Sequence, residues 1–210
     1  MNFRQHRSIR LAALGALILT AMVATREDRA GLRAQEARVV VSSAAGNFLT
    51  GTYREKDIQD FEIGRKALAA TAHLETEERE RQGRALLRTL RSSAVFAIEQ
   101  YGTTVMMNYP GGIRVPYEAD GKLRRMRATG GESINIRAAF DAARRLTIDL
   151  MWSGGERLRL IFDSSPDGET LTFTRIAGNR FLEHPIAVTS RYARESPKAT
   201  RVFERLAATP

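Results

Sequence analysis

Few residues of this sequence have the types and spacing that metal binding requires. The chain has three histidines and no cysteine. A zinc site needs three or four closely placed ligands, often two histidines one helical turn apart. His73 and His184 are far apart in the sequence, and neither has such a neighbour. We therefore predict no metal site and no resident cofactor.

The sequence also lacks a recognisable catalytic set. Ser153 and Ser133 follow or precede glycines, but each falls in a segment between two expected strands. A catalytic serine elbow joins a strand to a helix, and a phosphate-binding loop precedes a helix and carries a lysine. Glycoside chemistry needs two carboxylates that converge in a cleft, and Glu99, Glu118 and Asp149 are the candidates on expected strands. We name no catalytic residue and favour a non-enzymatic function.

A different group of residues has the pattern of a lined pocket. Arg175 has the parity of the apolar residues Leu171 and Phe173 on an alternating segment, which predicts that it faces inward. Glu99 has the parity of Tyr101 and of the apolar residues before it, so we expect it to face inward as well. The candidate ligand-binding residues are Glu99, Tyr101, Tyr109, Phe140, Phe162, Phe173 and Arg175.

Two interpretations of these inward residues remain open. Inward aromatic side chains either fill the interior of a small barrel or form the wall of a ligand site. An inward acid such as Glu99 could hold a ligand's amine or hydroxyl group, or it could pair with an arginine. An interior Glu–Arg pair is costly unless it is well hydrogen-bonded, so such a pair would favour a polar binding cavity.

The N-terminal segment predicts export. Arg4, Arg7 and Arg10 precede an uncharged, mostly apolar run over residues 11–25, which is the pattern of a signal peptide. The run is shorter than the roughly 20 residues that span a membrane. We assign residues 1–25 to the signal peptide and residues 26–37 to a polar spacer. The predicted location is the periplasm or the exterior of a bacterial cell.

Residues 54–92 have helical composition. The segment has no proline, and Phe61 and Leu68 are spaced to share one helical face with Ile58 and Ala72. Leu86, Leu87 and Leu90 form a second short apolar stripe. The mixed-sign run over residues 75–84 is typical of a solvated helix face, and a docking surface is the alternative.

From residue 94 onward the apolar period changes to two, which indicates strands with one buried face. Leu146, Ile148 and Leu150 alternate with polar neighbours, and similar alternation covers residues 133–140, 157–162 and 169–176. Seven short segments of turn residues, such as Asp120-Gly121, separate the apolar runs. Connections this short join antiparallel neighbours. We predict a mainly β fold, an antiparallel meander of about eight strands that closes into a barrel after a short helical segment.

Several sequence runs resemble a known group of proteins. PYEADGKLRRM, RLTIDLMWSGGERLRLIFD, SSPDGETLTFTRI and HPIAVTSRYAR resemble bacterial secreted, lipocalin-like β-barrel proteins of unknown function. The resemblance covers about residues 94–194 and consists mostly of turn and strand patterns. It implies an exported barrel with a short preceding helical stretch, and it implies no catalytic residues.

The sequence thus predicts one β-barrel domain over residues 38–194, with a helical insert at about 54–92 and a C-terminal tail over 195–210. The formal charge is +9, and removing Arg4, Arg7 and Arg10 lowers it to +6. This charge would suit an anionic surface, but an arginine excess also follows from genome composition, so we predict no nucleic-acid partner.

Two functions are compatible with this pattern. The first is binding of a small apolar or amphipathic ligand in the lumen. The alternative is an envelope interaction or scaffold protein with a filled barrel, whose helical insert, basic surface or tail contacts a protein partner or a membrane. An apolar turn of the tail, with Val202, Phe203 and Leu206, would belong to that contact.

Overall fold

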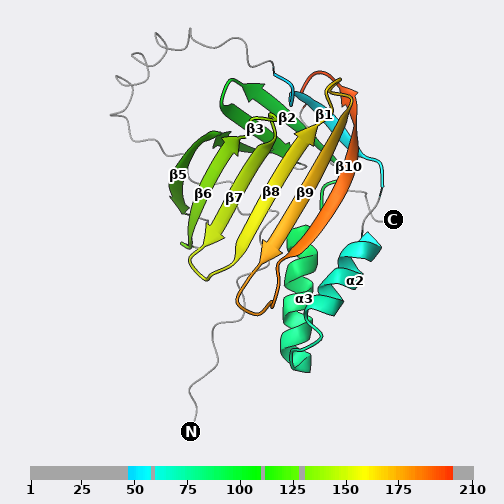
Figure 1. Ribbon diagram of the computed structural model, residues 1–210, viewed down its shortest axis with the longest axis vertical. Coiled ribbons are helices and arrows are strands. Elements are labelled where there is room, and N and C mark those ends of the chain that lie inside the picture. The colour runs from blue at the N-terminus through cyan, green and yellow to red at the C-terminus, as the bar shows by residue number, and fades with distance from the viewer. Residues whose placement is uncertain (1–46, 58–59, 110–111, 128–130, 201–210) are drawn as a thin grey trace.

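The computed structural model describes residues 47–57, 60–109, 112–127 and 131–200. The predicted signal peptide, the spacer and the apolar turn near Val202 lie outside the described residues. In the described part, ten antiparallel strands form one sheet with the order β4-β3-β2-β1-β10-β9-β8-β7-β6-β5 (Figure 1). The strands are β1 (Gly51–Glu55), β2 (Val95–Tyr101), β3 (Thr104–Tyr109), β4 (Ile113–Glu118), β5 (Asp120–Arg127), β6 (Ser133–Phe140), β7 (Leu146–Trp152), β8 (Arg157–Ser164), β9 (Thr170–Gly178) and β10 (Ile186–Ser196).

The sheet curves into a nearly closed barrel, which confirms the predicted mainly β fold. β4 and β5 are the two ends of the strand order, and β4 also contacts β6. The described residues contain ten strands where the sequence predicted about eight. The pattern of turn residues predicted neither β1, which precedes the helices, nor the hairpin at Gly102 (φ 59°) that separates β2 from β3. Most of the other boundaries follow the predicted turns.

The prediction that Asp120-Gly121 forms a hairpin is wrong. β4 and β5 follow one another with only Ala119 between them, yet they do not pair. Gly121 has a φ of 77°, and the register between β5 and β6 shifts between Asp120 and Leu123. The glycine therefore serves a β-bulge, which bends a strand, instead of a reversal. This bend carries the chain from one end of the sheet to the other.

Two helices lie between β1 and β2, α2 (Asp60–Ala70) and α3 (Thr76–Leu90). The predicted helical range 54–92 therefore begins too early, because Arg54 and Glu55 belong to β1. The charge run at residues 75–84 lies mostly within α3, a helix with a solvated side. Phe61 and Leu68 are exposed, whereas Ile63 and Ala67 of the same helix are buried. No described helix is both long and apolar enough to span a membrane.

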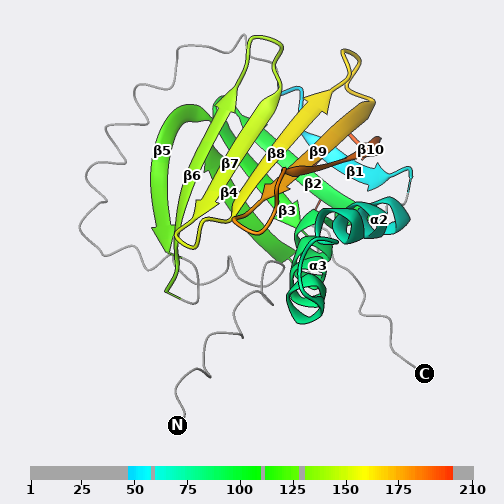
Figure 2. The ribbon, with the colours of Figure 1, turned by 60° about the horizontal axis from the view of Figure 1, so that its bottom comes forward.

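The helix pair lies at one end of the barrel, beside the end of β9 and the start of β10 (Figure 2). Lys66 Nζ donates to the carbonyl oxygen of Ala187 at 2.8 Å, and Asn179 Nδ2 donates to Oε1 of Gln82 at 3.0 Å. Leu86 and Leu90 of α3 are buried in the same apolar cluster as the strands. The helices thus cover this end and contribute side chains to the core.

Candidate ligand site in the barrel

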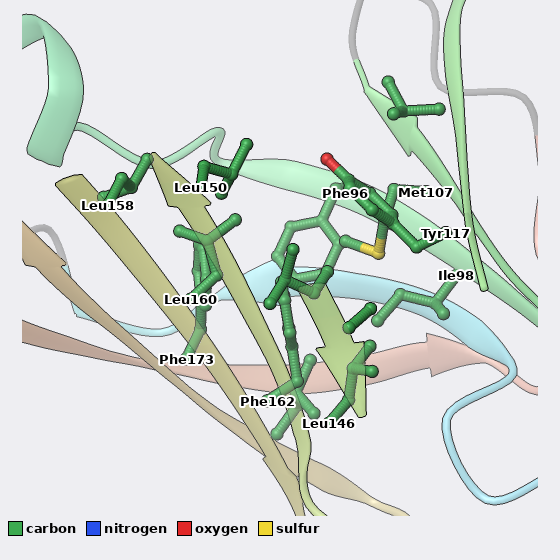
Figure 3. Close-up of a cluster of buried hydrophobic side chains, with 14 of the residues drawn as sticks. Phe96, Ile98, Met107, Tyr117, Leu146, Leu150, Leu158, Leu160, Phe162 and Phe173 are labelled. Carbon is green, nitrogen blue, oxygen red and sulfur yellow. The ribbon is translucent and has the colours of Figure 1, made fainter. Parts of the chain in front are cut away.

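Alternation along the strands produces an inward face of apolar side chains. In register, Leu146 faces Phe162 and Phe162 faces Phe173 across β7, β8 and β9. The rings of Phe162 and Phe173 stack with centroids 4.4 Å apart. Phe96 of β2 meets both rings edge-on, at 6.3 Å and 5.9 Å. Figure 3 shows these side chains converging from opposite parts of the barrel. One layer of the interior is therefore filled with aromatic rings.

A second group of inward side chains keeps slightly more exposed surface. Leu146, Phe162 and Leu171 are 0% exposed. A group of inward side chains retains between 6% and 9% of its surface; its members are Ile136, Leu150, Leu158, Leu160 and Phe173. Ile136, Leu150 and Leu158 are paired in register across β6, β7 and β8, and Leu160 and Phe173 lie further along β8 and β9. We call these five residues the inner apolar layer.

Arg175 lies beside the inner apolar layer and is 1% exposed. It pairs in register with Leu160 on β8 and Val188 on β10. Its Cζ is 5.0 Å from the ring centroid of Phe173, a cation–π distance. Nη2 donates a hydrogen bond of 2.6 Å to Oγ of Ser190. Nε and Nη1 are buried and have no partner among the described residues.

Arg175 is therefore a buried cation with little compensation. Burial lowers the pKa of Arg175, and the negative charge of Glu55 opposes this effect. No ion pair among the described residues involves Arg175, whose guanidinium has no carboxylate within contact. Leaving a buried charge unpaired is costly. The guanidinium of Arg175 is thus a buried polar group whose hydrogen-bond donors are only partly satisfied by the described residues.

The nearby polar groups already have partners. The Tyr192 hydroxyl donates to the carbonyl oxygen of Ser93 at 3.0 Å, and Ser92 Oγ donates to Oε1 of Glu55 at 2.9 Å. Burial raises the pKa of Tyr192, so its hydroxyl stays protonated at neutral pH. Of Arg175, Tyr192, Ser92 and Glu55, only Arg175 thus has hydrogen-bond donors without a partner among the described residues.

Two further tyrosines, Tyr109 of β3 and Tyr117 of β4, lie close enough together that each influences the pKa of the other's hydroxyl group. Burial raises the pKa of Tyr109 to about 12, and it raises the pKa of Tyr117 as well. Because both pKa values are raised, both hydroxyls stay protonated at neutral pH, and this pair adds polarity without adding charge.

The structure brings together only some of the residues predicted to line the lumen. Phe162, Phe173 and Arg175 lie next to one another in the interior. Tyr109 also faces inward, because it has the parity of the buried Val105 and Met107 along β3. Phe140 lies at the end of β6 and is partly buried, with its ring centroid 5.5 Å from that of Phe48. It is therefore at the edge of the aromatic cluster.

The predicted inward orientation of Glu99 and Tyr101 is wrong. Phe96, Ile98 and Gln100 are the buried, inward residues of β2. Glu99 instead forms an ion pair of 2.9 Å with Arg114 of β4 on the other face, and Tyr101 is 66% exposed. The run Val95–Ile98 is apolar at every position, so the sequence does not show which of its residues face inward. An interior Glu–Arg pair does not form.

Several interior residues were not among the predicted site residues. Ser190 and Tyr192 alternate with Ile186 and Val188 along β10, and this pattern could have identified Ser190 as inward-facing. The alternation of residues 157–162 predicts that Leu160 lies on the apolar face of its strand, but Leu160 is not among the predicted site residues. His73 and His184 are exposed, and the described residues contain no group of three potential metal ligands.

Comparison with known proteins adds no assignment. No protein-family model and no curated protein matches the chain. Among solved structures, a luciferase domain from the dinoflagellate Lingulodinium polyedrum is similar at a TM-score of 0.49 and 10% sequence identity. The alignment covers 75% of this chain and 45% of that one, so the chain spans less than half of the neighbour's length. This likeness carries no functional argument, and the class that the structure itself defines is an antiparallel β-barrel.

Proposed function

We propose that this protein binds a small amphipathic molecule inside its barrel, at the inner apolar layer. The observation that carries the proposal is the residual exposure of five inward side chains, each 6–9% exposed, next to inward side chains that are 0% exposed. In a closely packed interior, side chains are in contact with protein atoms over nearly all of their surface. A mostly apolar wall with a few polar groups is the usual composition of a small-molecule site.

The covered end of the barrel supports the same function. α2 and α3 lie over this end and are held to β10 and the β9–β10 connection through Lys66 and Gln82. His73 adds a contact of 3.2 Å between its ring nitrogen and the carbonyl oxygen of Phe181. Leu86 and Leu90 of α3 are also buried in the core shared with the strands, so apolar as well as polar contacts hold the helices over this end.

A blocking variant tests the proposed function. Leu160→Trp adds bulk inside the inner apolar layer, and Ile161→Trp adds the same bulk to the neighbouring residue on the outer face of β8. Calorimetric titration of the full chain with dodecanol should show binding by the wild type and by Ile161→Trp, and none by Leu160→Trp. Equal binding by both variants would place the ligand elsewhere. A Leu160→Trp chain that unfolds, as overpacking of a filled interior would cause, would favour a solid barrel.

We also propose that the protein is exported, on the basis of the basic and apolar N-terminal pattern at residues 1–25. Expression of the full chain in a bacterium should place it in the periplasmic or extracellular fraction, with a new N-terminus near residue 25. N-terminal sequencing measures this directly. Recovery of the intact chain from the cytoplasm would contradict the proposal.

A second candidate function is attachment to a partner through α2. Phe61 is 85% exposed and Leu68 is 65% exposed, and their spacing of seven residues places them on one side of the helix. Large exposed apolar side chains that share a face are typical of interaction surfaces. Replacing both with serine should abolish the attachment without changing dodecanol binding, and cross-linking in the cell envelope measures it.

A further inference from the structure

We infer that Arg175, together with Ser190, binds the carboxylate head group of a singly charged amphipathic ligand. This inference rests on the proposed function and names the chemistry of the ligand. It starts from a guanidinium that has five N–H donors, of which only one on Nη2 has a partner, Oγ of Ser190. Nε and Nη1 remain buried without a partner among the described residues.

An anion is the group that these donors require. A neutral acceptor would complete hydrogen bonds but would leave the positive charge uncompensated in an apolar interior. A carboxylate does both, because arginine and carboxylate form short, charge-assisted hydrogen bonds in a matching planar geometry. It would also offset the desolvation that lowers the pKa of Arg175. The hydroxyl of Ser190, which is 0% exposed, holds the guanidinium in place.

The surroundings limit the ligand to one negative charge. Arg175 is the only buried cation among the described residues, and Glu55 is close enough to influence its pKa. The hydroxyl of Tyr192 is committed to the carbonyl oxygen of Ser93. A phosphate dianion would therefore bring one charge that nothing balances.

The same surroundings require an apolar body behind the head group. Arg175 is paired in register with Leu160 on β8 and with Val188 on β10. Phe173 lies under the guanidinium and also belongs to the inner apolar layer. A ligand that reaches Arg175 thus places its remaining atoms against aliphatic and aromatic side chains. A medium-chain fatty acid has this chemistry.

Titration calorimetry with three probes of equal chain length tests the inference on the full chain. Wild-type protein should bind dodecanoate more tightly than dodecanol, and more tightly than dodecyl phosphate. Arg175→Met removes the charge and keeps an apolar side chain. It should weaken dodecanoate binding by about tenfold or more and leave dodecanol binding within about twofold. Arg191→Met, an exposed arginine one residue beyond Ser190, is the matched control and should change neither affinity.

The outcomes separate this inference from the proposed function. Dodecanoate binding that survives Arg175→Met overturns the head-group site while the lumenal function stands, and so does tighter binding of dodecyl phosphate by the wild type. A wild type that binds no probe overturns both. If Arg175→Met does not fold, the Nε–H resonance of Arg175 in the wild type should shift on addition of dodecanoate and not of dodecanol. No shift with dodecanoate would overturn the inference.

Discussion

The rings of Phe162 and Phe173 stack with centroids 4.4 Å apart and an interplanar angle of 9°. They come from paired residues on β8 and β9, and they differ in one respect. Phe162 is 0% exposed, whereas Phe173 retains 7%. The stacked pair is therefore the boundary between the filled aromatic layer and the inner apolar layer. Stability should depend on the first ring, and ligand contact on the second.

Truncating the filled side of this boundary should be costly. Phe162→Ala should lower the free energy of unfolding by about 3–5 kcal/mol, because it leaves a cavity in a fully packed layer. Phe61→Ala, which truncates a ring that is 85% exposed, is the control and should have an effect within about 0.5 kcal/mol. Urea denaturation of both variants measures the difference. Similar losses in the two variants would contradict the assignment of Phe162 to the packed layer.

Removing the buried charge should stabilise the ligand-free protein. The double variant Arg175→Met, Ser190→Ala replaces an under-bonded guanidinium and its hydroxyl partner with apolar groups, a change that is often neutral or stabilising by about 1–4 kcal/mol. We expect its thermal midpoint to equal or exceed that of the wild type after lipid extraction. A clear loss of stability would show that Arg175 supports the fold itself rather than a ligand.

Alkaline pH should destabilise the protein through its buried tyrosines. The pKa of Tyr109 is raised to about 12, and the pKa values of Tyr117 and Tyr192 are raised as well. Above pH 10 the unfolded chain releases these protons while the folded chain retains them, so the unfolded state binds fewer protons and is favoured as pH rises.

Each such tyrosine contributes a decline of about 1.4 kcal/mol per pH unit between its unfolded and folded pKa values. These tyrosines should thus leave the free energy of unfolding unchanged below pH 10 and should lower it as the pH rises from 10 to 12. Urea denaturation as a function of pH measures this fall, and Tyr109→Phe should make it shallower. An unchanged slope in that variant would contradict the role of Tyr109.

Replacing Gly168 and Gly64 with alanine should change the stability of the protein in opposite directions. Gly168 has a φ of 75°, and a Cβ there would lie 2.9 Å from Nη1 of Arg194. Gly168→Ala should therefore cost about 1–2 kcal/mol or more. Gly64, within α2, has no atom within 4 Å of the corresponding Cβ position, and Gly64→Ala should stabilise by about 0.5–1 kcal/mol. Thermal denaturation measures both, and effects of the same sign would contradict this account.

The fold could be predicted from the sequence where apolar residues alternate. β7, β8 and β9 follow the predicted parity, because their inward residues alternate with polar ones that remain on the surface. The parity of β2 could not be predicted, because both faces of residues 95–98 are apolar and Ala97 is 0% exposed. The bulge at Gly121 was also beyond prediction, since Asp-Gly is compatible with either a reversal or a bend.

The candidate site was predicted only in part. The parity of Arg175 with Leu171 and Phe173 identified it as inward-facing, but its partner did not follow from the sequence. Glu99 was the expected interior acid, and the strand register instead places it next to Arg114. The contact between Arg175 and Ser190 depends on the pairing of β9 with β10, which a single sequence does not specify. Packing differences between two layers of one barrel likewise arise only in three dimensions.

Native mass spectrometry of the full chain, purified from its exported fraction before and after solvent extraction, tests the central claim of a lumenal ligand most directly. The account predicts a reproducible additional mass that extraction removes and that fragmentation identifies as a carboxylate with an apolar body. It also predicts that the extracted protein regains this mass on addition of dodecanoate. A bare polypeptide mass in both preparations, with no uptake of dodecanoate, would contradict the account and favour the filled scaffold.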